Sequence, residues 1–194
     1  MCGIFGIVSG TPTEEAVVEN ALDRLRHRGP DGRGLWLSPD RSASLGHVRL
    51  SILDLSPLGA QPMANGDESL RITFNGEIYN FRELRAELER SGFVFRSGTD
   101  TEVILHGYRL WGPAVVGRLR GMFALGIWDT ETKTLFLARD RLGIKPLYYY
   151  WDQKTFAFAS EPQALLDIPN LDLSVDTSAL YDYLTYIYVP CPKT

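Results

Sequence analysis

A run of short apolar segments in the second half of the chain limits the possible folds most strongly. Polar turns, such as those at residues 129–132 and 152–154, separate these segments. Turns this short leave no room for a crossover helix, so consecutive strands have to pair antiparallel. The pattern therefore predicts antiparallel sheet rather than a parallel βαβ fold. The predicted strands are residues 123–128, 135–138, 147–151 and 156–159.

The first half of the chain combines further predicted strands with three predicted helices. Thr13 and Asn80 each precede apolar residues at helical spacing and can act as N-caps. Thr99 and Glu102 form a capping box before the third helix. The helices come in two groups between runs of strands, which indicates the α+β class, with helices packed outside antiparallel sheets. The predicted strands here are residues 3–8, 34–37, 43–50 and 70–74.

The composition excludes several classes of protein. The 194 residues carry 44% hydrophobic and 23% charged side chains, which is the balance of an ordinary globular domain. A formal net charge of -4 argues against nucleic acid or an anionic membrane as a partner. No apolar stretch is long enough to span a membrane, and no basic segment precedes residues 4–8 as it would in a signal peptide. These features predict a cytoplasmic protein.

The cysteine and histidine residues argue against a metal centre. Cys2 and Cys191 stand near opposite ends of the chain and are too few for a disulfide framework. The histidines are scattered, without the spacing of a zinc site. The sequence also lacks a Walker loop, and no third glycine follows residues 32–34. We therefore predict no metal and no cofactor in this domain.

Cys2 follows the initiator methionine directly and precedes an apolar strand, in the sequence MCGIFGIVSG. If Met1 is removed, a thiol with an ordinary pKa of about 8.5 and an α-amine with a pKa of about 8 belong to one residue. The amine can then act as the base for the thiol, directly or through water. If Met1 stays, the Cys2 nitrogen is an amide and cannot do so. The alternative interpretation is a small buried side chain without a chemical role.

Three further motifs carry polar groups that suit the binding of an amino acid. In FNGEIYN, Asn75 and Gly76 can supply N–H donors to an oxyanion, although Asn-Gly more often forms a hairpin turn. In HVRLSILD, Arg49 can hold a carboxylate or only extend to the surface. In SGTDTEV, Asp100 can hold an ammonium group together with Glu77, or only favour a helix N-terminus. Each motif alone leaves both interpretations open.

Taken together, these segments resemble the glutaminase domain of class II glutamine amidotransferases, in the branch that includes the asparagine synthetases. The matching stretches occur in the family's order from Cys2 to about Leu166. The resemblance implies an N-terminal-nucleophile hydrolase fold, a four-layer αββα sandwich of two antiparallel sheets. The matching stretches are MCGIFGI, RHRGPDG, LSILDLSPLGAQPM, FNGEIYNFRELR, SGTDTEVILHGY, LRGMFALGIWD, ARDRLGIKPLYY and FASEPQALL.

The resemblance also implies a reaction and its residues. Cys2 would attack the carboxamide of L-glutamine to form a thioester, and water would then release glutamate after ammonia has left. Asn75 and Gly76 would hold the oxyanion. Arg49 would bind the α-carboxylate, Glu77 and Asp100 the α-amine, and backbone groups of residues 50–53 would line the pocket. The implied substrate-binding residues are Arg49, Leu50, Ser51, Ile52, Leu53, Asn75, Gly76, Glu77 and Asp100.

For the whole chain, the resemblance implies two parts. Residues 1–170 would form the glutaminase domain, and residues 171–194 a tyrosine-rich connector helix toward a C-terminal synthetase domain. In the family, that second domain receives the ammonia and uses ATP and magnesium to convert aspartate to asparagine. Its SGGLDS-type loop does not occur here, so we expect glutamine hydrolysis alone from this chain. A homodimer is compatible with the pattern.

Two alternatives stay open at this point. One is a glutaminase domain that supplies ammonia to another acceptor. The other is a catalytically silent assembly module. The joint presence of Cys2, Arg49, Asn75, Gly76 and Asp100 speaks against the silent module, because a degenerate domain should have lost at least one of them.

Overall fold

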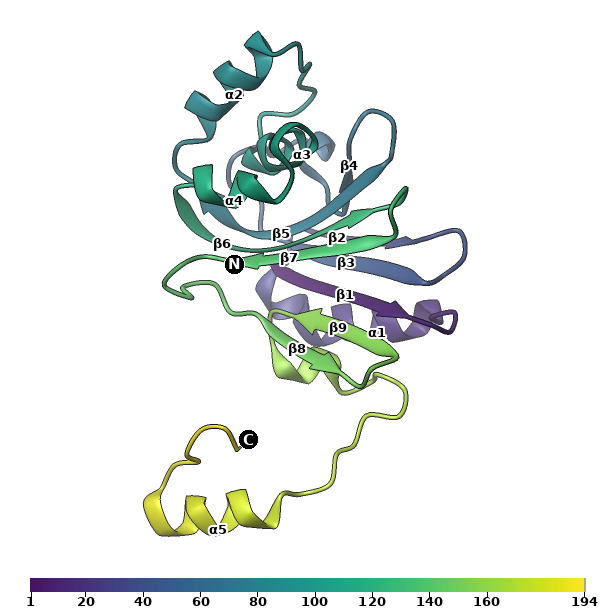
Figure 1. The fold of residues 1–194 in the computed structure, drawn as a ribbon, viewed down its shortest axis with the longest axis vertical. Coiled ribbons are helices and arrows are strands. Elements are labelled where there is room, and N and C mark those ends of the chain that lie inside the picture. Colours follow the sequence, from purple (N-terminus) through teal and green to yellow (C-terminus); the bar gives the residue numbers. More distant parts are fainter. Residues whose placement is uncertain (194) are drawn as a thin grey trace.

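The computed structural model describes residues 1–193, which form two antiparallel sheets (Figure 1). The strands of the five-stranded sheet are β1 (Gly3–Ser9), β2 (Gly32–Leu37), β3 (Ala43–Arg49), β8 (Tyr148–Trp151) and β9 (Thr155–Ala159), in the spatial order β2-β3-β1-β9-β8. The strands of the four-stranded sheet are β4 (Met63–Ala64), β5 (Leu70–Ile78), β6 (Gly121–Asp129) and β7 (Thr134–Arg139), which lie in chain order. The helices are α1 (Glu15–Leu25), α2 (Phe81–Arg90), α3 (Asp100–Trp111), α4 (Val115–Arg118) and α5 (Thr177–Tyr186). Short 3-10 turns are η1 (Arg26–Arg28), η2 (Pro57–Gly59), η3 (Gly112–Ala114) and η4 (Pro162–Leu165).

Helices and sheets are stacked in four layers. Helix α1 covers the outer face of the five-stranded sheet, and α2, α3 and α4 lie over the outer face of the four-stranded sheet (Figure 1). Buried apolar side chains fill each interface: one cluster under α1, one between the sheets and one under α2 and α3. The predicted αββα arrangement of antiparallel sheets is therefore confirmed.

Phe158 of β9 fills part of the space between the two sheets. A Cβ atom at Gly6 of β1 would lie 2.3 Å from its ring, and one at Gly126 of β6 would lie 2.4 Å from it. Both positions therefore require glycine. The ring is completely buried, so it contributes to the packing that holds the sheets together.

Strand β5 is longer than the sequence suggested and contains the Asn-Gly pair. The predicted strand ended at Phe74, whereas the observed strand continues to Ile78, with Asn75 opposite Ala124 and Gly76 opposite Phe123. The hairpin interpretation of Asn-Gly is wrong here. A Cβ atom at Gly76 would lie 2.3 Å from the Met122 carbonyl oxygen, so glycine serves close strand packing instead of a turn.

The predicted helix caps are partly confirmed. Thr99 is the N-cap of α3, and its side chain accepts a hydrogen bond from the Glu102 N–H at 3.4 Å. Helix α1 is preceded by Glu14 instead of Thr13 as its N-cap residue. Asn80 stands at the N-cap of α2, but its amide bonds the Arg118 carbonyl and the Arg120 N–H instead. Asn80 therefore ties α2 to the segment before β6.

The C-terminal segment differs from the rest of the chain in its packing. Asp176 caps α5 through hydrogen bonds from Ser178 and Ala179, and the helix ends before Ile187, which has a φ of 62°. The helix lies apart from both sheets (Figure 1), and most of its apolar side chains are exposed. Within residues 1–193, no helix has the length and apolar character needed to cross a bilayer.

Candidate active site

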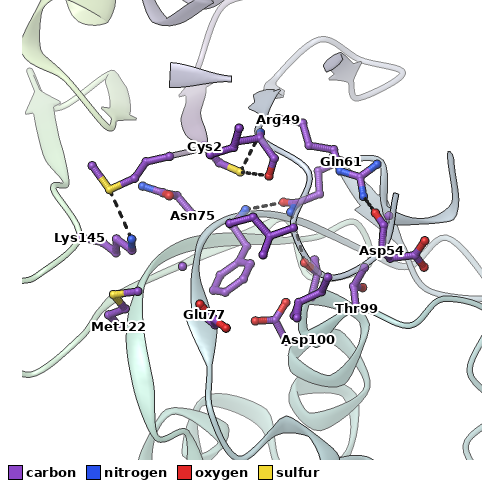
Figure 2. Close-up of a pocket in the computed structure, with 18 residues that line it drawn as sticks. Cys2, Arg49, Asp54, Gln61, Asn75, Glu77, Thr99, Asp100, Met122 and Lys145 are labelled. Carbon is purple, nitrogen blue, oxygen red and sulfur yellow. Dashed lines mark hydrogen bonds between the residues drawn. The ribbon is translucent and has the colours of Figure 1, made fainter. Parts of the chain in front are cut away.

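The predicted nucleophile and most predicted binding residues line one cavity of about 120 Å³ (Figure 2). It lies where the segment before β1, the end of β3, the middle of β5 and the N-terminus of α3 meet. Elements from both sheets thus build one site. The lining residues are Met1, Cys2, Arg49, Leu50, Ile52, Leu53, Asp54, Gly59, Gln61, Phe74, Asn75, Gly76, Glu77, Thr99, Asp100, Thr101, Met122 and Lys145.

Cys2 is held in place by residues of the segments that border the five-stranded sheet. The Leu50 N–H donates to the Cys2 Sγ at 3.3 Å, and the Sγ lies 3.6 Å from the Leu50 carbonyl oxygen. Arg28 Nε donates to the Cys2 carbonyl at 3.0 Å, and Arg28 Nη1 binds Glu161 at 2.7 Å. The thiol is therefore fixed at the edge of the cavity, as a positioned nucleophile requires.

Asn75 points a buried amide into this site. Its side chain is 2% exposed, and within residues 1–193 its Nδ2 has no hydrogen-bond partner. A buried donor without a partner costs free energy, so such groups are rare in folded proteins. The amide nitrogen is thus a donor available to a bound molecule beside Cys2.

The backbone of β5 adds a second donor. N–H groups of alternate strand residues point to the same side. The Phe74 N–H donates to Gln61 Oε1 at 2.6 Å, and the Ile78 N–H donates to Asp100 Oδ2 at 2.9 Å. The N–H of Gly76, between them, faces that same side and lines the cavity. Asn75 and Gly76 therefore offer two adjacent N–H donors.

Asp100 and Glu77 form an acidic end of the cavity (Figure 2). Asp100 is the first residue of α3 and is 5% exposed. Burial, aided by the neighbouring Glu77 charge, raises the pKa of Asp100 to about 6 against the lowering effect of the hydrogen bond from Ile78. The Asp100 carboxylate is ionised at neutral pH and suits a cationic group.

Arg49 brings a positive charge to the same cavity. Its Nη1 donates to the Ser56 carbonyl at 3.0 Å, and its Nη2 donates to the Asp54 carbonyl. Because a guanidinium has five N–H donors, it keeps donors for a ligand carboxylate. The Gly98 N–H donates to Asp54 Oδ2 at 2.9 Å and so links the loop after Arg49 to the segment before α3. This hydrogen bond and those from Ser56 lower the pKa of Asp54 to about 2.

The four predicted wall residues after Arg49 do not all face the cavity. Leu50, Ile52 and Leu53 line it. The Ser51 N–H instead donates to Asp31 Oδ2 at 2.8 Å, and Ser51 lies against a neighbouring cavity of about 260 Å³. The hydrogen bond to Asp31 holds Ser51 on the side of this second cavity.

Sequence reasoning missed several lining residues. Gln61 joins the loop to the site, because its Oε1 accepts the Phe74 N–H and its Nε2 donates to Thr101 Oγ1 at 3.2 Å. Gln61 and Thr101 lie inside the matching stretches, which was the available signal. Lys145 and Met122 also lie inside matching stretches, and the pairing of distant segments brings them to the cavity.

His47 lies behind the site and is not a candidate base. It is 1% exposed, and its Nε2 lies 3.2 Å from the Phe74 carbonyl oxygen. Burial lowers the pKa of His47 to about 4, so the ring is neutral at neutral pH. Among residues 1–193, no three His, Cys, Asp or Glu side chains gather in a group that could hold a metal ion.

The sequence profile of the glutamine amidotransferase domain matches residues 1–194. The chain belongs to this amidotransferase family. Asparagine synthetase [glutamine-hydrolyzing] 1 of Bacillus subtilis is 41% identical to this amidotransferase domain over 199 residues, which cover 100% of the domain and 31% of that relative. A putative asparagine synthetase [glutamine-hydrolyzing] 2 of Methanocaldococcus jannaschii is 38% identical and is covered to 40% of its length.

Solved structures support the fold assignment. The glutamine phosphoribosylpyrophosphate amidotransferase of B. subtilis, complexed with ADP and GMP, matches with a TM-score of 0.73 at 24% sequence identity. The match covers 84% of this amidotransferase domain and 43% of that chain. At this identity the match shows a shared fold, which agrees with the αββα sandwich expected from the sequence.

Proposed function

We propose that this amidotransferase domain hydrolyses L-glutamine to glutamate and ammonia, with Cys2 as the nucleophile. The proposal rests on the buried Asn75 amide, whose nitrogen has no partner within residues 1–193 and which lines the same cavity as the Cys2 thiol. An amide held there without a partner suits an oxyanion that exists only during the reaction.

The cavity can hold the α end of glutamine away from the thiol. Arg49 supplies donors for the α-carboxylate, and Glu77 with Asp100 supplies carboxylates for the α-ammonium. These opposite charges fit a free amino acid better than a peptide, whose α groups are neutral amides. The carboxamide end of the substrate then extends toward Cys2 and Asn75 (Figure 2).

The proposed reaction begins with processing of the N-terminus. Met1 is removed, so the Cys2 nitrogen becomes a free amine. This amine takes the thiol proton as the Sγ bonds to the carboxamide carbon. Asn75 Nδ2 and the Gly76 N–H donate to the oxyanion of the tetrahedral intermediate.

The second half of the reaction releases both products. The amine returns its proton to the leaving nitrogen, the C–N bond breaks, and ammonia departs from the γ-glutamyl thioester. A water molecule then gives a proton to the amine and its oxygen to the carbonyl carbon. The C–S bond breaks, glutamate leaves, and the thiol is restored.

The decisive experiment measures glutamate release from glutamine by the processed chain. Cys2→Ala should reduce release to background, whereas Cys191→Ala, which changes the exposed second cysteine, should leave it unchanged. Mass spectrometry of the intact protein reports whether Met1 is absent. Undiminished release by the Cys2→Ala variant would overturn the mechanism.

We further infer that the ammonia serves asparagine synthesis in a longer protein. The chain spans about a third of the B. subtilis asparagine synthetase that it matches. We propose residues 1–170 as the glutaminase domain and residues 171–194 as a connector to a synthetase domain that binds ATP and magnesium. The exposed aromatic side chains of β8 and α5, including Tyr149, Trp151 and Tyr181, would contact that domain.

The acceptor is tested with the full-length gene product. Glutamine, aspartate, ATP and magnesium should yield asparagine, and replacing aspartate with another acceptor should not yield an amidated product. Glutamine hydrolysis without asparagine formation would retain the glutaminase proposal and reject the acceptor. A cytoplasmic location, the absence of a resident cofactor in this domain and a homodimer remain predictions.

A further inference from the structure

Lys145 is a buried cation beside the nucleophile that the proposed mechanism does not use. It stands in the loop between β7 and β8, is 6% exposed and lines the Cys2 cavity. Its Nζ lies 3.4 Å from the Met1 Sδ, and it makes no salt bridge within the described residues 1–193. Buried lysines usually pair with a carboxylate, so this placement calls for an explanation.

The loop holds the Lys145 backbone firmly. Asp140 Oδ2 accepts the Lys145 N–H at 3.0 Å and the Phe123 N–H at 3.2 Å, and Arg139 Nε donates to the Lys145 carbonyl at 2.6 Å. Phe123 lies opposite Gly76 in the β5–β6 pair. The same ladder that positions the oxyanion donors therefore also positions Lys145.

The lysine is close to the future N-terminus. Five covalent bonds separate the Met1 Sδ from the Cys2 nitrogen, so the ammonium lies within about 10 Å of that nitrogen. The Met1 side chain occupies the space next to the ammonium. Removal of Met1 clears these atoms and leaves Lys145 and the new α-amino group of Cys2 at one cavity.

We propose that the Lys145 ammonium keeps the Cys2 α-amino group unprotonated near neutral pH, so that it can accept the thiol proton. This inference rests on the proposed glutaminase function. Two positive charges in a partly enclosed cavity repel each other, and the amine avoids the repulsion by releasing its proton. Lys145 thus acts through the amine as a tuning residue.

The other charged groups around the terminus do not replace this effect. Arg28 donates to the Cys2 carbonyl, but its charge is offset by Glu161. Arg49, Asp54, Glu77 and Asp100 lie across the cavity from Lys145 (Figure 2). Arg139 and Asp140 support the Lys145 loop from behind. Among the residues that the structure describes, Lys145 is therefore a cation without a salt bridge on the Met1 side of the site.

The test compares the pH dependence of glutamine hydrolysis in variants of the processed chain. Lys145→Met should shift the acid limb of the kcat/KM profile to higher pH by about one pH unit, because the amine is then protonated more easily. Lys145→Arg should restore the original limb, because it keeps the charge. Lys154→Met, at the exposed β8–β9 turn, removes the same charge elsewhere and should leave the profile in place.

A second measurement observes the amine directly. The rate of reductive methylation at the N-terminus, read by mass spectrometry against pH, gives the pKa of the Cys2 amine without glutamine. The midpoint pH of this methylation profile should be higher in Lys145→Met than in the wild-type chain, and it should be unchanged in Lys145→Arg. Unchanged midpoints in an active Lys145→Met enzyme would overturn the inference while retaining the glutaminase. An inactive wild-type chain would instead reject the proposed function.

Discussion

The Cys2 cavity and the α5 segment contain similar apolar and polar residue types but use them in opposite ways. In the layered region that carries the cavity, apolar side chains such as Phe158 are buried between the sheets. Polar groups at the cavity bond partners far away in the sequence, as the Leu50 N–H does with the Cys2 Sγ. In α5, Tyr181 and Leu184 are 70% and 69% exposed, and the capping bonds are local. A helix can thus form from its N-cap and the helical spacing of its apolar residues without contributing to the core.

This difference teaches where function can be positioned. A catalytic group needs neighbours that cannot move independently, which the layered region supplies. An exposed aromatic surface instead suits contact with another protein surface.

Phe158→Ala should destabilise the layered region strongly. It removes a completely buried ring that packs against Gly6 and Gly126 and leaves a cavity between the sheets. We expect a loss of about 3–5 kcal/mol in the free energy of unfolding, measured by urea titration. A loss below about 1 kcal/mol would mean that the contact between the sheets does not depend on this ring.

Asn75→Ala should affect catalysis more than folding. Loss of one oxyanion donor typically lowers kcat by about 10²–10³. Because Asn75 Nδ2 has no partner within residues 1–193, little stability should be lost. Steady-state kinetics and thermal unfolding of the same sample separate the two effects.

Asn65→Ala is the matched control for that substitution. Its amide donates to Ser69 Oγ at 3.0 Å and accepts the Leu70 N–H at 3.0 Å, away from the cavity. This variant should lose about 1 kcal/mol of stability or somewhat more and keep its kcat. A normal kcat in Asn75→Ala together with a reduced kcat in Asn65→Ala would contradict the role of Asn75 as an oxyanion donor.

The acidic end of the cavity should produce a pH-dependent KM. Burial raises the pKa of Asp100 to about 6, so this carboxylate is charged above that pH and neutral below it. The KM for glutamine should therefore be flat above pH 6 and rise toward tenfold per pH unit below it. Asp100→Asn should have a high KM at all pH values and lose this dependence.

Tyr181→Ala should have the smallest effect. The side chain is 70% exposed in α5, and alanine favours helix formation. We expect the free energy of unfolding to change by less than about 0.5 kcal/mol and kcat to change by less than about twofold. A large loss of stability in this chain alone would show that α5 packs on the layered region.

Local patterns made much of the fold predictable. Short turns permit only antiparallel pairing, and Thr99 with Glu102 marked the start of α3. Thr13 failed as a cap, because α1 begins at Glu15, so that Glu14 stands at the N-cap position and makes no side-chain capping bond. Asn75-Gly76 failed as a turn, because a local pattern cannot report that β6 lies across from it.

Local sequence patterns determined the antiparallel pairing of strands joined by short turns, the start of α3 and the chemical groups available, since these depend on residues a few positions apart. Only the tertiary structure decided that Asn75 keeps an unpartnered amide, that Ser51 faces away and that Lys145 reaches Met1. The physical reason is distance along the chain. Cys2, Asn75 and Lys145 meet through the packing of two sheets, and that packing depends on burial across the whole domain.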